Sequence, residues 1–530
     1  MSLALVIGAG PTGMTAAIEL KRLGMDVRII DKGSHIARHS QALVVQARTL
    51  EQWQRYGIAE KAVERGRKLT EVKFWSNSKN LVSFELSAIP SRYPYVLFLP
   101  QTETEALLNE MMESLGVFTE RGTELIAFIQ KADGVLARIR HPDGSEEDTA
   151  ARWLIGCDGA RSMVRKTAGI TFEGGGVGIS FFLADLVLEG PDVPENELAL
   201  HLHKGDVILL GRLSDKITRL IAAVHSKQDS HTLRELTIKD IQDAIDGAGV
   251  QVKVLSSEWM TPFRVNDLQA KHYRSDNVYL AGDASHIHSP VGGQGMNTGI
   301  QDIANLAWKL AAVEAGAPES LLDSYEEERA EVGRALLSFT ERGLKMATTS
   351  NPVLEAARDL LIPHLTQLHA VQKRLLAFIS ELSINYRSSS IVSDLGGDGS
   401  LRAGDRMPDL AINQLIGQRS LLADWTQAEH LAVILNCTDS EIYELTPRLE
   451  GVPQVMLNGS QLDEEGLRLL GNDAKLLLVR PDGYVGFRGP VVRAAELEGY
   501  MQMVGLHQAI PNLEQAAIRT SRVIERSHLF

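Results

Sequence analysis

The chain opens on the stretch LALVIGAGPTGMTAAIEL, residues 3–20, which decides the type of fold expected. Residues 3–7 form a short apolar run without alternation, as in a parallel strand buried on both faces. The run leads directly into three glycines spaced GxGxxG. Gly8 permits the tight turn, Gly10 lets the backbone approach a pyrophosphate, and Gly13 lets the next helix pack closely on the strand.

A helix, a second strand and an acidic residue complete this unit. The helix is predicted over about 11–23, and its N-terminal amides point at phosphate groups. A second strand is predicted to end at Asp31, 18 residues beyond Gly13, where adenosine ribose hydroxyls lie in such sites. Together these features indicate a dinucleotide site, to which we assign Thr12 and Lys32 as well. They do not distinguish FAD from NAD(P).

Composition excludes several classes of protein. A chain of 530 residues is long enough for two or three domains. The formal net charge of -14 disfavours nucleic acid or an anionic membrane as a partner, and no later stretch reaches the ~18 apolar residues of a membrane span. The two cysteines, Cys157 and Cys437, are typical of reduced thiols in a cytoplasmic protein. The acidic composition fits a small-molecule substrate better than nucleic acid or a membrane. No metal site is expected.

Two further motifs follow predicted buried strands. The run 153–155 ends in GCDGARSMVR (156–165), which contains Asp158. The run 278–281 leads into GDASHIHSPVGGQGMNTGIQDIANLAWKL (282–310). With the opening glycines, these segments closely resemble the single-component FAD-dependent aromatic hydroxylases, the group that includes phenol hydroxylase and the polyketide hydroxylases. The resemblance covers roughly residues 1–345.

The resemblance implies an enzyme with FAD as cofactor and NADPH or NADH as co-substrate. In this family a hydride reduces the flavin, O2 adds to the reduced ring, and the resulting hydroperoxide hydroxylates a phenolic or polycyclic aromatic molecule. Because the hard chemistry belongs to the cofactor, no catalytic side chain is identified. A flavoprotein dehydrogenase or reductase without oxygen insertion, or a non-catalytic flavin-binding module, stays open as an alternative.

The third motif suits a flavin on physical grounds. Asp283, at a strand end, can accept hydrogen bonds from ribityl hydroxyls. A glycine-rich backbone lets a flat ring lie close, and a helix N-terminus stabilises negative charge on the reduced ring. Pro290 is placed beside the flavin by its motif match. The candidate contacts of this segment are Asp283, Pro290, Gly293, Gly295, Met296 and Asn297.

Other matches are local. The segment QARTLE resembles the arginine segment that contacts FAD in this family, which carries over Arg48, and LPQTETEALL likewise carries over Gln101. Arg161 either binds a phosphate or caps local structure. His286 and His288 lack the partners of a metal site, so packing or backbone hydrogen bonding is predicted for both.

The fold class predicted is α/β: a Rossmann-like FAD-binding domain, an inserted antiparallel-sheet substrate domain and a C-terminal thioredoxin-like domain. Short strands are predicted over 181–188, 199–202, 207–210 and 219–224, and a linker over 386–406. Cys437 has no cysteine partner nearby, so the C-terminal domain is expected to be structural or interfacial. A homodimer is left open. The boundaries are 1–175 and 275–395 for the FAD-binding domain, with part of 70–100 free to join the substrate domain, 176–274 for the substrate-binding domain and 396–530 for the thioredoxin-like domain.

Overall fold

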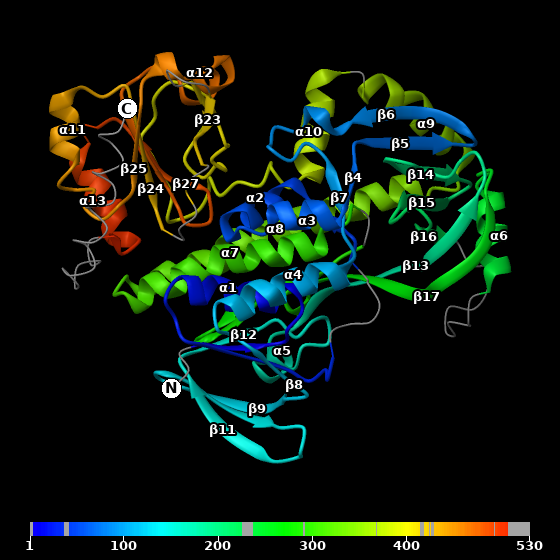
Figure 1. The fold of residues 1–530 in the computed structure, drawn as a ribbon, viewed down its shortest axis with the longest axis horizontal. Coiled ribbons are helices and arrows are strands. Elements are labelled where there is room, and N and C mark those ends of the chain that lie inside the picture. Colours follow the sequence, from blue (N-terminus) through cyan, green and yellow to red (C-terminus); the bar gives the residue numbers. More distant parts are fainter. Residues whose placement is uncertain are drawn as a thin grey trace. The chain divides into compact units, whose positions relative to one another are not determined.

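The computed structural model forms two compact units (Figure 1). The first unit contains the described residues up to 303, apart from 22–24, together with 329–384. The second contains 22–24, 304–328 and the described residues from 385 onward. The residues described are 4–35, 42–224, 237–289, 292–366, 368–413, 418–422, 425, 429–491 and 493–506.

A six-stranded sheet of the order β18-β19-β12-β1-β2-β8 carries the opening motif. Its strands from β19 to β8 run parallel, and only β18 is antiparallel to its neighbour. Every residue of β1 and of β12 is buried, which is why both read as continuous apolar runs. The predicted Rossmann-like α/β class is confirmed. The elements are β1 (Ala4–Ile7), α1 (Pro11–Arg22), β2 (Val27–Asp31), β8 (Thr119–Arg121), β12 (Trp153–Gly156), α5 (Met163–Thr167), β18 (Arg274–Ser275) and β19 (Val278–Leu280).

An eight-stranded sheet of the order β20-β17-β13-β16-β15-β14-β5-β6 forms the second layer of this unit. Figure 1 shows its strands from β17 to β6 stacked in this order. The predicted antiparallel strands are confirmed, but β5 joins β14 in parallel. The strands are β5 (Glu71–Ser76), β6 (Lys79–Glu85), β13 (Phe172–Glu189), β14 (Glu197–His203), β15 (Asp206–Arg212), β16 (Thr218–Val224), β17 (Lys253–Ala270) and β20 (His286–Ile287).

The two faces of this sheet have different neighbours. Ile208 and Leu220 pack with Ile241 of helix α6 (Ile238–Gly247) in one apolar cluster. The next residue along each strand, Leu209 or Ile221, points to the other face and lines a cavity. This alternation follows from the two-residue period of a strand. The sheet therefore presents an apolar face to the cavity.

Smaller sheets and several helices complete the first unit. Helices α7 and α8 account for the helical region predicted over 301–345, and both contribute residues to the two units. The remaining elements are β3 (Val44–Val45), α2 (Ala47–Tyr56), α3 (Ala59–Arg65), β4 (Arg67–Leu69), β7 (Val96–Phe98), α4 (Gln101–Ser114), β9 (Glu124–Lys131), β10 (Gly134–Arg140), β11 (Glu146–Ala151), α7 (Gly295–Glu314), α8 (Asp323–Ala347), α9 (Pro352–Thr366) and α10 (His369–Ile379).

The second unit contains a five-stranded sheet of the order β21-β27-β26-β24-β25. The predicted hairpin is present as β26 and β27, joined antiparallel. The topology does not by itself test the thioredoxin-like assignment or the domain boundaries, which stay predictions. The elements are β21 (Ser393–Asp394), β22 (Ala411–Asn413), β23 (Gln418–Ser420), β24 (Leu431–Leu435), α11 (Asp439–Leu445), β25 (Gln454–Leu457), α12 (Glu464–Leu470), β26 (Lys475–Val479), β27 (Val485–Gly489) and α13 (Ala494–Met503).

The prediction of a linker over 386–406 was wrong. Tyr386, Leu401 and Ala403 are buried, and the Tyr386 amide donates to the Gly404 carbonyl at 2.7 Å. Gly404 has a φ of 89°, and a Cβ there would lie 2.4 Å from the Arg387 nitrogen. The glycines of this segment make tight turns inside a packed unit rather than a flexible connection.

Four charged side chains are buried together in the second unit. Glu328 accepts hydrogen bonds from Arg480 at 2.6 and 2.9 Å and from Lys309 at 2.8 Å. Asp482 also pairs with Arg480. The four groups balance in charge, as buried ions must. Residues 304–328 thus share one polar core with the C-terminal segment.

Candidate active site

The opening glycines divide their roles between packing and ligand access. A Cβ on Gly8, whose φ is +98°, would lie 2.4 Å from the Cys157 carbonyl oxygen. A Cβ on Gly13 would lie 1.8 Å from the Gly8 oxygen, so helix α1 approaches the strand as closely as predicted. A Cβ on Gly10 would meet no protein atom within 4 Å, and Gly10 lines the cavity. The space beside Gly10 is therefore available to a ligand.

Asp31 closes the same turn from the second strand. Its two carboxylate oxygens accept hydrogen bonds from the amides of Ala9 and Gly33, each at 2.6 Å. Neither Asp31 nor the exposed Lys32 is among the cavity-lining residues described, whereas Thr12 is. Asp31 thus holds the glycine turn in shape, and its contact with an adenosine ribose stays a prediction.

The second motif places a capping acid next to cavity residues. Asp158 accepts hydrogen bonds from the amides of Met163 and Val164 at 2.6 and 3.1 Å, at the start of α5. Its neighbours Cys157 and Arg161 line the cavity, but Asp158 itself does not. Burial raises the pKa of the Cys157 thiol well above its usual value, which keeps it protonated.

Asp283 presents a carboxylate to the cavity. It lies in a 3-10 turn, Gly282–Ala284, directly after β19. No residue in the described ranges hydrogen-bonds its carboxylate, although the side chain is accessible from the cavity. Enclosure by the surrounding protein raises the pKa of this carboxyl group. A ligand with hydroxyl groups would supply the hydrogen bonds that the protein leaves unmade.

The glycine loop before α7 is fixed by Asn297. The Asn297 amide nitrogen donates to the carbonyls of Val44 and Gly293, both at 2.8 Å. Its oxygen accepts from the Gln46 amide at 2.9 Å and the Thr49 hydroxyl at 2.7 Å. Gly293, with φ +62°, packs so closely that a Cβ would lie 2.6 Å from Val44. The side chain of Asn297 is thus fully used in shaping this loop.

The start of α7 opens on the cavity. Gly293, Gly295 and Met296 line it, at the positive end of a 20-residue helix. The positive end of the α7 dipole therefore faces the cavity. Pro290, which was predicted to lie beside the flavin, is outside the described residues.

The two locally matched residues differ in position. Gln101 lines the cavity, accepts from the Ala42 amide at 3.0 Å and donates to Glu105 at 2.8 Å. Arg48 is buried, pairs with Glu51 at 3.0 Å and is not among the described lining residues. Arg48 is therefore buried without lining the cavity, and its predicted FAD contact stays a prediction.

The two histidines have different surroundings. His286 is buried and bonds Asp302 at 2.8 Å, and Asp302 also pairs with Arg329 at 2.7 Å. Although burial opposes it, the neighbouring His286 and Arg329 lower the pKa of Asp302. The prediction of packing or backbone bonding therefore missed a side-chain network at His286. It is confirmed at His288, whose Nδ1 lies 2.9 Å from the Ser289 carbonyl. No group of metal-ligating side chains occurs within the described part of the chain.

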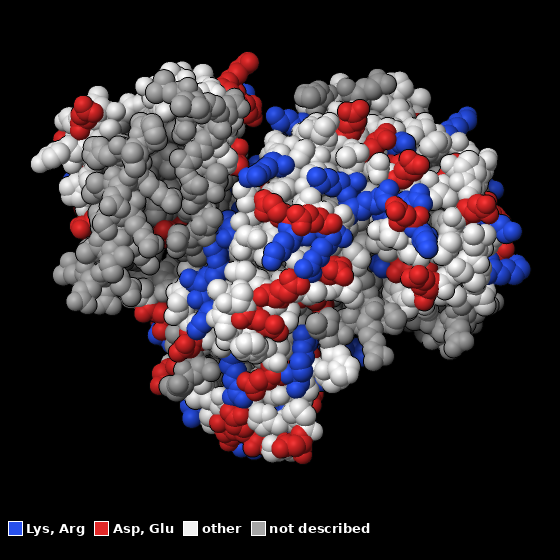
Figure 2. Space-filling view, in the orientation of Figure 1, with Lys and Arg blue, Asp and Glu red and all other residues white. Residues whose placement is uncertain are grey.

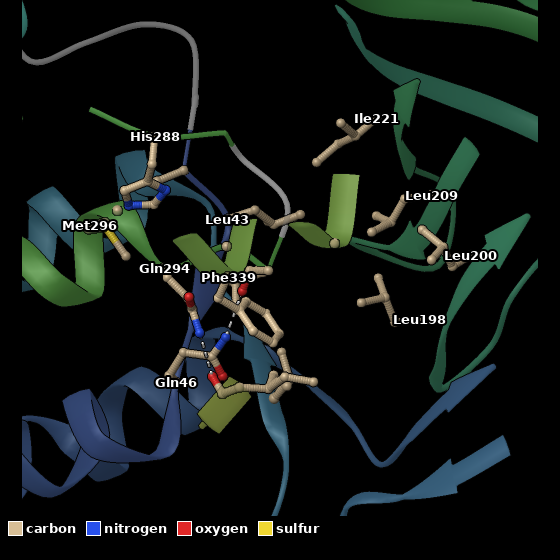
Figure 3. Close-up of a pocket in the computed structure, with 18 of the residues that line it drawn as sticks. Leu43, Gln46, Leu198, Leu200, Leu209, Ile221, His288, Gln294, Met296 and Phe339 are labelled. Atoms are coloured by element: carbon tan, nitrogen blue, oxygen red, sulfur yellow. Dashed lines mark hydrogen bonds between the residues drawn. The ribbon is translucent and has the colours of Figure 1, made fainter. Parts of the chain in front are cut away.

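One cavity of about 1130 Å³ joins these motifs to the eight-stranded sheet. In Figure 3, Leu198, Leu200, Leu209 and Ile221 extend from the sheet toward Gln46, Gln294 and Phe339. One end of the cavity is therefore lined by polar backbone and glycine, and the other by large apolar side chains. Such a division suits a ligand with a phosphate-bearing half and an aromatic half.

Three buried acceptors around the glycine loop have no partner. Gln46 Nε2 donates to the Gly292 carbonyl at 3.0 Å, and Gln294 Nε2 donates to the Phe378 carbonyl at 3.2 Å. A carbonyl only accepts, so in each amide the oxygen is the end left over, and neither oxygen has a partner. For the same reason Nδ1 of His288 carries the proton and the unpartnered Nε2 is an acceptor. Burial lowers the pKa of His288 to about 4, so its ring is neutral.

The cavity fits FAD on these observations. The open space at Gly10, the unpaired carboxylate of Asp283 and the buried acceptors all call for a ligand with phosphates, hydroxyls and N–H groups. The sequence did not point to Gln46 or Gln294, although each lies inside or next to a quoted motif, because nothing in the pattern says where an amide points. Arg342, another lining residue, lies outside every motif.

The two-layer fold and this cavity define a flavin-binding enzyme with a large apolar compartment beside the cofactor site. Residues 2–340 match the model of the family described as "FAD binding domain", and the chain belongs to this family. It is 33% identical over 525 residues to 6-methylpretetramide 4-monooxygenase of Streptomyces rimosus, covering 95% of this chain and 93% of the relative. It is 29% identical over 520 residues to pentachlorophenol 4-monooxygenase of Sphingobium chlorophenolicum, covering 92% and 94%.

The solved structures agree. The anhydrotetracycline hydroxylase OxyS from Streptomyces rimosus superposes with a TM-score of 0.78 at 30% identity, over 95% of this chain and 99% of the other. The protein is thus an FAD-dependent, NAD(P)H-consuming enzyme of this hydroxylase class, as the sequence predicted. None of the described helices combines the length and hydropathy needed to cross a bilayer.

Proposed function

We propose that this enzyme hydroxylates a polycyclic aromatic substrate with phenolic groups, held between the glycine loop before α7 and the leucine-lined face of the eight-stranded sheet. The observation that carries the proposal is the shared cavity. Its volume of about 1130 Å³ exceeds the usual range for small-molecule sites, which leaves room for a multi-ring substrate beside a flavin ring. One relative is named a 6-methylpretetramide 4-monooxygenase and another a pentachlorophenol 4-monooxygenase, and between these two types of substrate the apolar wall favours the larger.

The residues that would hold FAD divide along the cavity. We assign the pyrophosphate end to Gly8, Gly10, Thr12 and Gly13, supported by Asp31, Asp158 and Arg161, and the ribityl chain to Asp283. The flavin ring would be bordered by Gln101, Gly293, Gly295, Met296 and the backbone amide of Asn297. Bound FAD supplies hydride acceptance from NADPH or NADH and the activation of O2.

The remaining tasks fall to this chain. The α7 N-terminus would stabilise negative charge on the ring next to it. The apolar wall would exclude water and orient the aromatic substrate by its shape. Leu209 and Ile221 would contribute to the reaction in this way. His288 is neutral and accepts rather than donates at Nε2, so it can receive a hydrogen bond from an O–H or N–H group.

Compartment and assembly are further parts of the proposal. We place the enzyme in the cytoplasm, because both of its cysteines are free thiols rather than a disulfide. Burial raises the pKa of Cys437 to about 11 and that of Cys157 well above its usual value. A homodimer is the assembly to test, since α9 exposes Val353 by 75% and Leu361 by 53%. Light scattering at several concentrations measures it.

Oxygen labelling tests the function. With a hydroxylated anthraquinone or a related polycycle that speeds NAD(P)H oxidation, the product should gain one oxygen atom from ¹⁸O2 and none from H2¹⁸O. A dehydrogenase with the same flavin site would pass electrons without inserting oxygen. Formation of the same product under anaerobic conditions with another electron acceptor would therefore refute the monooxygenase reaction.

A further inference from the structure

The charges that line the cavity contrast with those of the chain. The protein carries a formal net charge of -14, and Figure 2 shows both signs interspersed over the face it presents. The described lining of the cavity nevertheless contains three arginines, Arg161, Arg342 and Arg358, and one carboxylate, Asp283. Arginines thus outnumber carboxylates in the described lining, as expected for a site that receives anionic groups.

Two of these arginines have an evident task. Arg161 lies in the second motif, beside the lining residues Gly159 and Ala160 and at the end where the phosphates are proposed to bind. Arg358 is buried and holds the chain together: it donates to Ser76 at 3.0 Å, to the Ala347 carbonyl at 3.3 Å and to Asp359 at 2.9 Å. Neither task explains Arg342.

Arg342 lies on the substrate side of the cavity. It belongs to the stripe of α8 formed by Phe339, Gly343 and Met346, all of which line the cavity at helical spacing. Its sequence neighbour Glu341 pairs instead with Lys345 at 2.5 Å. Arg342 is an exposed residue at the cavity, its charge helps Lys345 to lower the pKa of the adjacent Glu341, and within the described ranges its guanidinium has no hydrogen bond or ion pair to the protein.

We propose that Arg342 binds an ionised oxygen of the aromatic substrate, a phenolate, enolate or carboxylate, and thereby selects acidic polycycles. This inference rests on the proposed function and specifies its substrate class. When a large apolar substrate fills the cavity, water around the guanidinium is displaced, and an unpaired cation is costly to desolvate. An anionic oxygen on the substrate replaces that water with a charge-assisted hydrogen bond.

The choice of an ionised oxygen also suits the chemistry. A phenolate ring is richer in electrons than the phenol, and the described cavity lining contains no acidic group on the substrate side that would repel it. A cation beside the oxygen favours its charged form, so the substrate can bind already ionised. No side-chain base is then needed in the cavity to deprotonate it.

The experiment compares two probes of equal shape. The FAD-loaded enzyme is titrated with 9,10-anthraquinone-2-carboxylate and with the neutral 2-carboxamide, and binding is followed by the flavin absorbance. Wild type should prefer the carboxylate by roughly ten-fold to a hundred-fold, the range of one charge-assisted hydrogen bond. Arg342→Gln should abolish the preference while changing carboxamide affinity less than about three-fold. Arg342→Lys should keep part of the preference, because it keeps the charge without the bidentate geometry.

A matched control removes a charge from the same helix. Arg334 is exposed on α8 and is absent from the described lining, so Arg334→Gln should bind both probes as wild type does. An unchanged preference in Arg342→Gln with full FAD content, or equal binding of both probes by wild type, would overturn the inference. A raised KM for NADPH alone would overturn it too and assign Arg342 to the nicotinamide. If neither probe perturbs the flavin, both this inference and the polycyclic substrate are wrong, whereas the oxygen-labelling result tests the reaction by itself.

Discussion

Replacing Glu381 with Gln should make the protein more stable at alkaline pH. Glu381 is buried just after α10, where it accepts hydrogen bonds from Thr298 at 3.2 Å and from Gln301. Burial raises the pKa of this carboxyl from 4.5 to about 8, against smaller opposite effects of Thr298 and Arg329. Because the folded pKa lies above the unfolded one, the stability that the neutral acid contributes is complete below pH 4.5 and is lost as pH rises through about 8.

The magnitude follows from this difference. Each pH unit between the two pKa values costs the wild type about 1.4 kcal/mol, so stability falls by roughly 3 to 4 kcal/mol between pH 5 and pH 8 because of this one group. Glutamine has the same shape and no charge, so Glu381→Gln lacks that loss. The free energy of unfolding of the variant should therefore rise relative to wild type by about the same amount over this interval.

Urea unfolding at a fixed excess of FAD, followed by flavin fluorescence, measures the difference because it reports on the unit that contains the cavity. Glu64→Gln, at an exposed site on α3, is the control and should differ from wild type by a constant. Parallel stability curves for Glu381→Gln and wild type from pH 5 to pH 8 would refute the reasoning, since Glu381 would then ionise as an ordinary surface acid.

Three further predictions concern the cofactor and the C-terminal cysteine. Gly10→Leu should fold but lose FAD, because the new side chain enters open space in the cavity; circular dichroism and flavin content measure this. Gly13→Ala should instead reduce the amount of soluble protein, since its Cβ would overlap the Gly8 oxygen at 1.8 Å. Asp283→Asn should weaken FAD binding roughly ten-fold to a hundred-fold, the value of one charge-assisted hydrogen bond, while the exposed Asp133→Asn should not; equal FAD affinity in both would dismiss the ribityl assignment. Cys437→Ser should leave turnover of NAD(P)H within about two-fold, because no second cysteine lies near enough in sequence for a redox pair. A large loss of activity there would revive a redox function.

Local features could be predicted from the sequence because their causes are local. The glycine turn follows from backbone sterics, so Gly8 and Gly13 could be assigned their packing tasks before any coordinates. The buried strands β1 and β24 follow from unbroken apolar runs. The linker failed for an instructive reason: the glycines of 386–406 were read as flexibility, whereas Gly404 serves a turn between buried neighbours. Composition alone does not separate these two uses of glycine.

The unpredicted part of the site consists of partners far apart in sequence. The predicted flavin contact of Asn297 stays a prediction, whereas its side chain bonds Gln46, 251 residues away, and this unpredicted contact fixes the glycine loop. His286 finds its acid in Asp302 and, through it, Arg329. Glu381 contacts Thr298, and Arg342 faces the cavity without a motif around it. A sequence pattern records which groups are available, whereas their pKa values and free hydrogen-bonding capacity depend on which distant groups the fold brings beside them. The motifs therefore identify the cofactor, whereas Arg342 and Leu209, to which we assign substrate selection, come together only in the assembled cavity.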